Sequence, residues 1–125
     1  MNLIIIDCSV QKDTRLFEEI ANFNVSAKTG EYTVPSTDPN TPTTTKNRFT
    51  YIRVVYPHEV TQQIVDLLQP GSMIRLYGKL DSEQYETKRE KIVFNKVICA
   101  DRIVRIRYDK TLHDYVEVDV DGNSQ

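Results

Sequence analysis

The stretch from Tyr51 to Leu80 limits most strongly what this chain can fold into. At its start Tyr51 and Arg53 alternate with the apolar residues Ile52 and Val54. Successive side chains of a β-strand point to opposite faces, so this alternation is typical of a strand. The sequence therefore predicts a strand with one apolar face and one face of aromatic and basic side chains.

The residues that follow predict a helix and a second strand. Pro57 cannot donate a backbone hydrogen bond to a sheet and ends the first strand. Apolar residues at helical spacing predict a short amphipathic helix over Glu59–Leu68, and Pro and Gly at Gln69–Ser72 predict a turn. Met73–Leu80 then alternates again. We therefore expect an all-β chain with one helix: a five-stranded OB-fold Greek-key barrel with the helix between its third and fourth strands.

These residues also resemble a known family, the bacterial-type single-stranded DNA-binding proteins. That family shows aromatic-x-Arg-Val-Val, a helix, Gly-Ser, and a strand ending in Gly-x-Leu. The matching residues here are Tyr51–Val55, Gly71–Ser72 and Gly78–Leu80, and Ile20–Ala27 resembles the family's second strand, which contains Ala-Asn-Phe. The resemblance implies an OB fold that binds single-stranded DNA during replication, recombination or repair and that is not an enzyme.

The chain departs from the family's pattern at several positions. It contains no Trp, whereas the family commonly stacks bases on Trp at the positions held here by Tyr51 and Tyr85. The Gly-Arg pair that usually closes the first strand is absent from Ile6–Ser9, and Pro57 stands where the family often has a stacking Phe. Such divergence suits a bacteriophage or mobile-element member better than a chromosomal one.

The length fits one compact domain, and the charge is unevenly distributed. Residues 28–108 hold thirteen Lys and Arg against nine Asp and Glu, whereas residues 109–125 hold one Lys against five acids. A mild basic excess in the barrel suits a phosphate-bearing partner although the whole chain carries a net charge of −2. We expect residues 1–108 to form the OB-fold domain and residues 109–125 to be an acidic, partly flexible C-terminal segment.

Several classes of protein are disfavoured. No apolar run is long enough for a membrane helix, and the start of the chain lacks the pattern of a signal peptide, so a cytoplasmic protein of a bacterial cell, or of a phage in its host, is expected. Cys8 and Cys99 lie in apolar strands and are expected to be reduced and buried. The sequence has no Cys/His cluster, so neither a metal nor another cofactor is expected.

The first expected strand, Asn2–Val10, is apolar on both faces, so something should cover its outer face. The helix or the C-terminal segment is one candidate. The resemblance implies another, because the family builds homodimers and homotetramers by pairing first strands. The family also recruits replication or recombination proteins through a hydrophobic C-terminal tip, which Asp121–Gln125 lacks.

The remaining segments alternate between strands and polar connections. Leu16–Ala27 predicts the second strand and Lys28–Glu31 a tight turn, while Tyr32–Asn47 is rich in Pro and Thr and is expected to form a loop without an element of its own. The other predicted segments are the charged hairpin Asp81–Lys91, the fifth strand Ile92–Ile106 with a bend near Ala100 and Asp101, and an extra strand within Tyr115–Val120.

A sequence-tolerant binder of single strands stacks bases on aromatic rings and places phosphates against cations. We expect the rings at 51, 77 and 85 to lie side by side with Arg53, Arg75 and Lys79 along one face of the barrel. The long loop adds candidates because the family closes this loop over DNA. The candidate contacts are Tyr51, Arg53, Arg75, Tyr77, Lys79, Tyr85, Lys88, Arg89, Lys91, Phe49, Tyr32, Lys46 and Arg48.

Other interpretations stay open at this point. Each strand residue among the candidates also fits ordinary solvent-facing cover of a sheet, and the charged hairpin and the long loop also fit solvated connections. An OB-fold replication or primosome adaptor that binds protein, or a single-stranded RNA binder, would suit the same composition. An enzyme is less favoured, because the sequence has no Gly-rich phosphate loop and no metal-ligand spacing, and His58 suits a surface or capping position.

Overall fold

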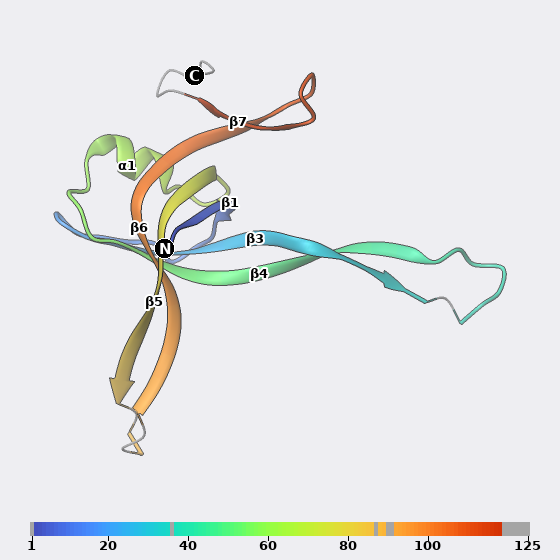
Figure 1. Ribbon diagram of the computed structural model, residues 1–125, viewed down its shortest axis with the longest axis horizontal. Helices are drawn as coiled ribbons and strands as arrows, with labels where there is room; N and C mark the ends of the chain where they lie inside the picture. The colour runs from blue at the N-terminus through green and yellow to red at the C-terminus, as the bar shows by residue number, and fades with distance from the viewer. Residues whose placement is uncertain (1, 36, 87, 90–91, 119–125) are drawn as a thin grey trace.

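The computed structural model describes residues 2–35, 37–86, 88–89 and 92–118, and it describes only the backbone of residues 83–86 and 92–94. The described chain consists mainly of strands, with one short helix (Figure 1). In chain order the elements are β1 Ile4–Val10, β2 Arg15–Leu16, β3 Ala21–Val34, β4 Thr44–Tyr56, α1 Gln62–Leu67, β5 Met73–Glu86, β6 Ile92–Asp109 and β7 Asp114–Val118.

Five of these strands close into a barrel. Each of β1, β5, β6, β4 and β3 pairs with the next, and β3 returns to β1 through Ser9 opposite Ser26 and Val10 opposite Val25. The contact between β4 and β6 is parallel and the others are antiparallel. With α1 between β4 and β5, the third and fourth barrel strands, this is the topology of an OB fold. The predicted fold class is therefore confirmed.

Alternation along the strands creates the core. Phe23 on β3, Val54 on β4 and Leu76 on β5 are at most 1% exposed. Ile64 on α1 and Leu68, directly after the helix, belong to the same core. The opposite face of β4 carries exposed side chains, as the alternating sequence predicted. Burial of the apolar face therefore fixes which β4 side chains point to solvent.

The helix is shorter than predicted. It begins at Gln62, after the N-cap Thr61, whose hydroxyl accepts a hydrogen bond from the Ile64 amide, whereas the sequence predicted a start at Glu59. The amide of Val60 donates to the carbonyl of Glu18 at 2.8 Å, so this residue ties the segment before the helix to the chain before β3. The long-range hydrogen bond, which no helical periodicity reveals, accounts for the late start.

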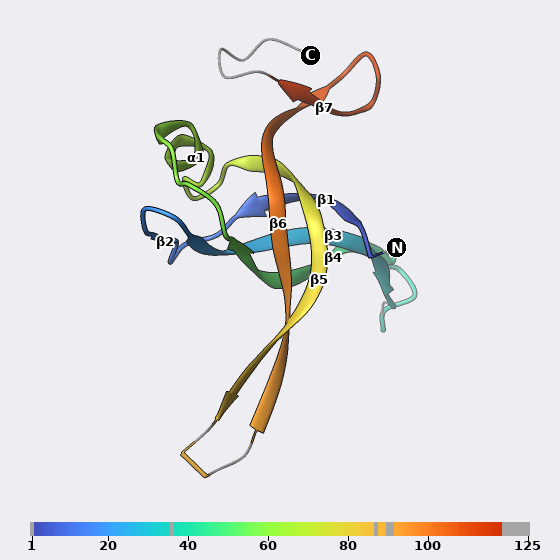
Figure 2. The same cartoon turned by 60° about the vertical axis from the view of Figure 1, so that its left-hand side comes forward.

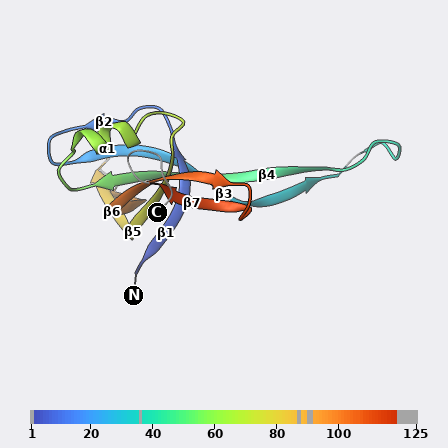
Figure 3. The same ribbon diagram turned by 90° about the horizontal axis from the view of Figure 1, so that it is seen from above.

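The segment expected to be a loop is strand at both of its ends, residues 32–34 and 44–47. β3 and β4 continue past the barrel as a two-stranded β3–β4 arm, in which Tyr32 pairs with Lys46 and Val34 with Thr44 (Figures 1 and 3). The expectation of a loop without an element was wrong at these two ends, because backbone pairing and β-branched Thr residues order a ribbon that buries almost no apolar surface. The described residues between Val34 and Thr44 form the connection.

The tight turn expected at Lys28–Glu31 is not present either. A β-bulge with Thr29 as the extra residue lies there, at the base of the arm.

Two other strand boundaries differ from the prediction, and one predicted irregularity is confirmed. The predicted second strand is divided into β2 and β3 by a turn in which the Phe17 amide donates to the Ile20 carbonyl. β5 and β6 run on as a β5–β6 arm, in which Asp81–Glu86 pairs with residues 92–97 (Figure 2). The predicted bend near Ala100 and Asp101 is confirmed as a bulge, since Tyr77 pairs with Arg102 while Gly78 pairs with Ala100.

β7 adds a strand outside the barrel and pairs with the end of β6. The extra strand predicted within Tyr115–Val120 is confirmed as far as Val118, which is 4% exposed, and residues 119 and 120 lie outside the described part. The hairpin of β6 and β7 stands at the end of the barrel opposite the β5–β6 arm (Figure 1). The last described residues are therefore part of the sheet.

Both cysteines are free thiols. Cys8 is buried, as predicted, and burial raises the pKa of its thiol from 9.0 to about 12, with the neighbouring Asp7 carboxylate acting in the same direction. Cys99 is only half-buried, and its pKa is also raised, chiefly by desolvation. Both groups are therefore protonated and poorly nucleophilic at neutral pH.

Within the described ranges, no helix has the length and apolar character needed to cross a membrane. The same residues contain no group of three or more His, Cys, Asp or Glu side chains that could hold a metal ion.

Replacing Gly78 should destabilise the barrel strongly. A Cβ at this position would collide with the carbonyl oxygen of Cys99 and would lie 2.9 Å from the Cα of Ala100. We expect Gly78→Ala to lower the free energy of unfolding by about 2 kcal/mol or more, because the backbone at the bulge must move. Gly30→Ala is the matched control, since nothing lies within 4 Å of its Cβ, and should change stability by less than about 0.5 kcal/mol. Equal stability of the two variants in chemical denaturation would contradict this account.

Candidate nucleic-acid interface

Tyr51 is the most exposed large aromatic or apolar side chain that the structure describes, with 71% of its surface accessible. It lies on the outer face of β4, and the residue that pairs with it on β3 is the small Ser26. The side chain directly opposite on β3 is therefore too small to cover the ring. A flat aromatic face is left open in the side of the barrel.

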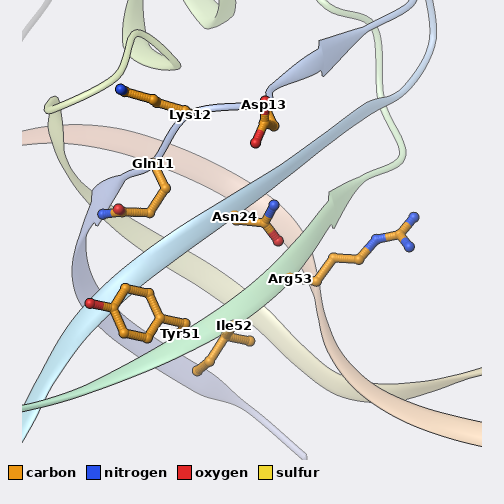
Figure 4. A pocket seen from close by; sticks show the side chains of 7 residues that line it. All are labelled: Gln11, Lys12, Asp13, Asn24, Tyr51, Ile52 and Arg53. Carbon is orange, nitrogen blue, oxygen red and sulfur yellow. The ribbon is translucent and has the colours of Figure 1, made fainter.

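Polar side chains from three segments line the same depression as this ring (Figure 4). Asn24 on β3 pairs with Arg53 on β4, and Gln11, Lys12 and Asp13 come from the connection between β1 and β2. Together with Tyr51 and Ile52 they line an open depression of about 430 Å³. The depression thus combines a ring face with amides, two cations and one carboxylate.

A second depression adjoins the first. Asp13, Asn24 and Arg53 line both, and the second adds Arg15 and Asn22. Lys12, Arg15 and Arg53 therefore gather on this face against a single acid, Asp13, among the lining residues. The local charge is positive although the whole chain is slightly acidic.

Four sequence-predicted residues lie on the β3–β4 arm, and all are exposed. Phe49, 50% exposed, pairs with Lys28 at the base of the arm, next to the bulge. Further out, the guanidinium of Arg48 lies over the ring of Tyr32, 5.8 Å from its centroid, and Lys46 is the register partner of Tyr32. Phe49 therefore continues the outer face of β4 that carries Tyr51 and Arg53, whereas Arg48 and Lys46 alternate to the opposite face of the arm.

A groove runs from the base of the β3–β4 arm over β1 to β7. Its lining includes Phe49 and Lys28 from the arm, Ser9 and Asp7 from β1, and Tyr115 from β7. The groove crosses strands that neighbour one another in the closed barrel, β4, β3 and β1. A continuous surface thus leads from Phe49 to β7.

Arg75 and Tyr77 are engaged within the protein. Nε and Nη2 of Arg75 donate to the two carboxylate oxygens of Asp7 at 2.6 and 3.0 Å, and Nη2 also donates to the Tyr115 carbonyl at 3.3 Å. This hydrogen bonding to Asp7 raises the pKa of Arg75 above its usual value. The hydroxyl of Tyr77 donates to Glu117 on β7 at 2.9 Å. These contacts join β1, β5 and β7.

The structure consequently does not place Tyr77 beside Tyr51. β6 lies between β5 and β4 on one side of the barrel, and β1 and β3 lie between them on the other. The Tyr77 ring is covered instead by the guanidinium of Arg102, 5.1 Å from its centroid. Tyr51 and Arg53 are brought together, and Arg75 and Tyr77 form a separate group.

The remaining candidates belong to β5 and its arm. Lys79 is exposed on β5, and Lys88 and Arg89 are exposed at the described part of the turn between β5 and β6. The side chain of Tyr85 and the whole of Lys91 lie outside the described residues. For those two the expectation of a contact stays a prediction.

Sequence patterns missed four residues around Tyr51, namely Gln11, Lys12, Asp13 and Asn24. Asn24 alternates with buried residues of β3, so its exposure was predictable, but its position opposite Arg53 depends on strand register. The other three belong to a polar turn whose position over β3 and β4 follows from barrel closure. The only available signal was the polar composition of that turn.

The solved structures that are similar to this chain include two single-stranded DNA-binding proteins. The SSB of Plasmodium falciparum in complex with single-stranded DNA matches with a TM-score of 0.56 and 18% identity, over 95% of this chain and 96% of that one. The small single-stranded DNA-binding protein of Streptomyces coelicolor matches with a TM-score of 0.55 and 13% identity, over 88% and 95%. No protein-family model matches the sequence, and comparison with curated proteins finds no match. At these identities the likeness supports the OB fold itself.

Removing Arg75 should weaken the fold. Arg75→Ala leaves the Asp7 carboxylate, 31% exposed, without its ion pair, and it removes a hydrogen bond to β7. We expect the free energy of unfolding to fall by about 1–3 kcal/mol in chemical denaturation. Lys79→Ala, an exposed change on the same strand, should cost less than about 0.5 kcal/mol. A similar loss in both variants would argue against a bracing role for Arg75.

Proposed function

We propose that this protein binds single-stranded DNA, stacking bases on Tyr51 and placing phosphates against the cations beside it. The observation that carries the proposal is the 71% exposed ring of Tyr51 in a depression also lined by Lys12 and Arg53, with Arg15 in the adjoining one. The likeness to two OB-fold proteins that bind single-stranded DNA supports it. The broader process would be replication, recombination or repair.

The chemistry of an unpaired strand matches this surface. Every base has a flat face, and stacking on an aromatic side chain contributes about 1–3 kcal/mol per base with little regard to sequence. A duplex hides these faces inside its stack. An exposed tyrosine in the wall of a barrel therefore favours single strands over duplexes, while the nearby cations add an attraction that salt weakens.

The two arms would lengthen the bound track. On the β3–β4 arm, the Arg48 and Tyr32 pair and the exposed Phe49 offer further stacking surfaces, and Lys46 offers a cation. On the β5–β6 arm, the exposed Lys88 and Arg89 are positioned at the outer turn. We propose that the central contact is at Tyr51 and that the arms add contacts of lower specificity.

Arg75 and Tyr77 take a different part in this proposal. Their charged and hydroxyl groups already have partners on β1 and β7, and a contact with DNA would have to replace them. They serve to brace β7 against the barrel. Lys79, Tyr85 and Lys91 stay in the proposal as accessory contacts, predicted from the sequence.

We further propose that the protein self-associates through β1. β5 pairs with Ile4–Ser9, whereas β3 pairs only with Ser9 and Val10, so most of one β1 edge has no partner among the described residues. Leu3 and Ile5 expose 58% and 56% of their surface there. An open edge beside apolar side chains favours strand pairing with a second copy.

A protein-binding adaptor is the second candidate function. The hairpin of β6 and β7 carries Tyr108, 50% exposed, and Leu112, 64% exposed, at its outer end. Exposed apolar side chains of this kind suit contact with another protein. This surface and the Tyr51 depression lie on different elements, so substitutions can separate the two functions.

Replacing Tyr51 should weaken binding to single strands. We expect wild-type protein to bind fluorescent oligo-dT much more tightly than a duplex, and Tyr51→Ala to lower the affinity about tenfold or more. Tyr108→Ala is the matched control, because it removes another exposed tyrosine from a different element. Affinity should also fall as salt rises.

The same titration separates the rival functions. Oligo-dT binding no tighter than duplex binding, or an equal effect of Tyr51→Ala and Tyr108→Ala, would favour the adaptor. Tighter binding of oligo-U than of oligo-dT would favour a single-stranded RNA binder, since the stacking chemistry is shared.

A charge at Ile5 should reduce self-association. We expect light scattering to give a mass of two or four 14.5 kDa subunits for the wild type, and a smaller mass for Ile5→Lys, because a lysine on an open edge opposes strand pairing. Leu112→Lys, an equally exposed change on the hairpin of β6 and β7, should leave the mass unchanged. A single-subunit wild type would exclude the proposed association.

A further inference from the structure

Asp13 has an unusual backbone conformation. Its φ is 70°, and the only other non-glycine residue with positive φ in the described ranges is His113. Residues other than Gly rarely adopt this region, although Asp and Asn tolerate it better than most. The conformation lies in the turn between β1 and β2, directly at the Tyr51 depression.

This turn places the Asp13 carboxylate on the side facing β3 (Figure 4). Asp13 lines both depressions together with Asn24 and Arg53, and it shares the first with Tyr51. A volume of about 430 Å³ lies within the range of sites that hold small ligands, roughly 300–1,000 Å³. A base stacked on Tyr51 would therefore have its edge close to these polar groups.

A carboxylate in such a position is unsuited to phosphate, because both carry negative charge. It accepts hydrogen bonds only, through two oxygens side by side. Guanine presents two adjacent donors on its pairing edge, N1–H and the N2 amino group. Thymine and uracil present one N–H there, and adenine and cytosine present one amino group. Guanine is therefore the base that a carboxylate can hold through two parallel hydrogen bonds.

The neighbouring amide completes the match. Guanine carries the acceptor O6 beside N1–H, and the side-chain amide of Asn24 can donate to it. We propose that Asp13 and Asn24 form a subsite that selects guanine for the base stacked on Tyr51, an inference that rests on the proposed binding of single-stranded DNA. The other contacts with the DNA strand remain tolerant of base sequence.

The test compares three DNA oligonucleotides of equal length. The first is oligo-dT, the second has one guanine at its centre, and the third has inosine at that central position. The wild type should bind the guanine strand about tenfold more tightly than oligo-dT, with inosine between them because it lacks the N2 amino group. Asp13→Asn should abolish the preference for guanine. Because Asn also tolerates positive φ, this variant keeps the turn.

Two controls separate this subsite from simpler effects. Asp66→Asn removes the same charge from the exposed face of α1 and should keep the preference. Asp13→Gly removes the carboxylate at a position that suits glycine and should behave like Asp13→Asn.

The outcomes are distinguishable. Oligo-dT binding that depends on Tyr51, with no preference for guanine or with a preference that survives Asp13→Asn, overturns the guanine subsite and leaves the proposed function standing. No binding of any single strand by the wild type overturns both.

Discussion

Closure of the barrel is the constraint on which the rest of the structure depends. It is completed by two short contacts, Ser9 and Val10 of β1 with β3, and residues 53–55 of β4 with residues 97–99 of β6. Once these strands are joined, each alternating residue must lie either in the core or in solvent. The exposure of Tyr51 and the position of the β1–β2 turn beside it both follow from this closure.

Local patterns in the sequence were sufficient for the barrel itself. The alternation around Val54, the apolar spacing of the helix and the irregularity near Ala100 each indicated the observed structure, because each reflects burial or backbone geometry within a few residues. The β3–β4 arm was missed for the opposite reason. Its polar strands bury little, so only backbone pairing between distant residues orders them, and composition carries little trace of that pairing.

In the candidate site, too, local patterns predicted some features, while others depend on pairing between distant residues. The exposure of Tyr51 and Arg53 was predictable from alternation, since both lie opposite the buried face of β4. The engagement of Arg75 by Asp7 was not, because these residues are 68 positions apart and meet only through the register of β1 and β5. Closure of the barrel also places Asp13, in the turn between β1 and β2, in the same depression as Asn24. The residues that surround a predicted site residue thus depend on pairing that sequence periodicity does not encode.

The β3–β4 arm has a consequence for how such a protein can change over evolution. From Lys28 outward its described side chains contribute nothing to the buried core, and its strands are held mainly by each other. Lengthening or shortening it by paired residues would therefore leave the barrel's packing intact. In the proposed function, the arm would set the length of single strand that the protein covers, whereas the core residues set the stability of the barrel. Either property could then change without the other.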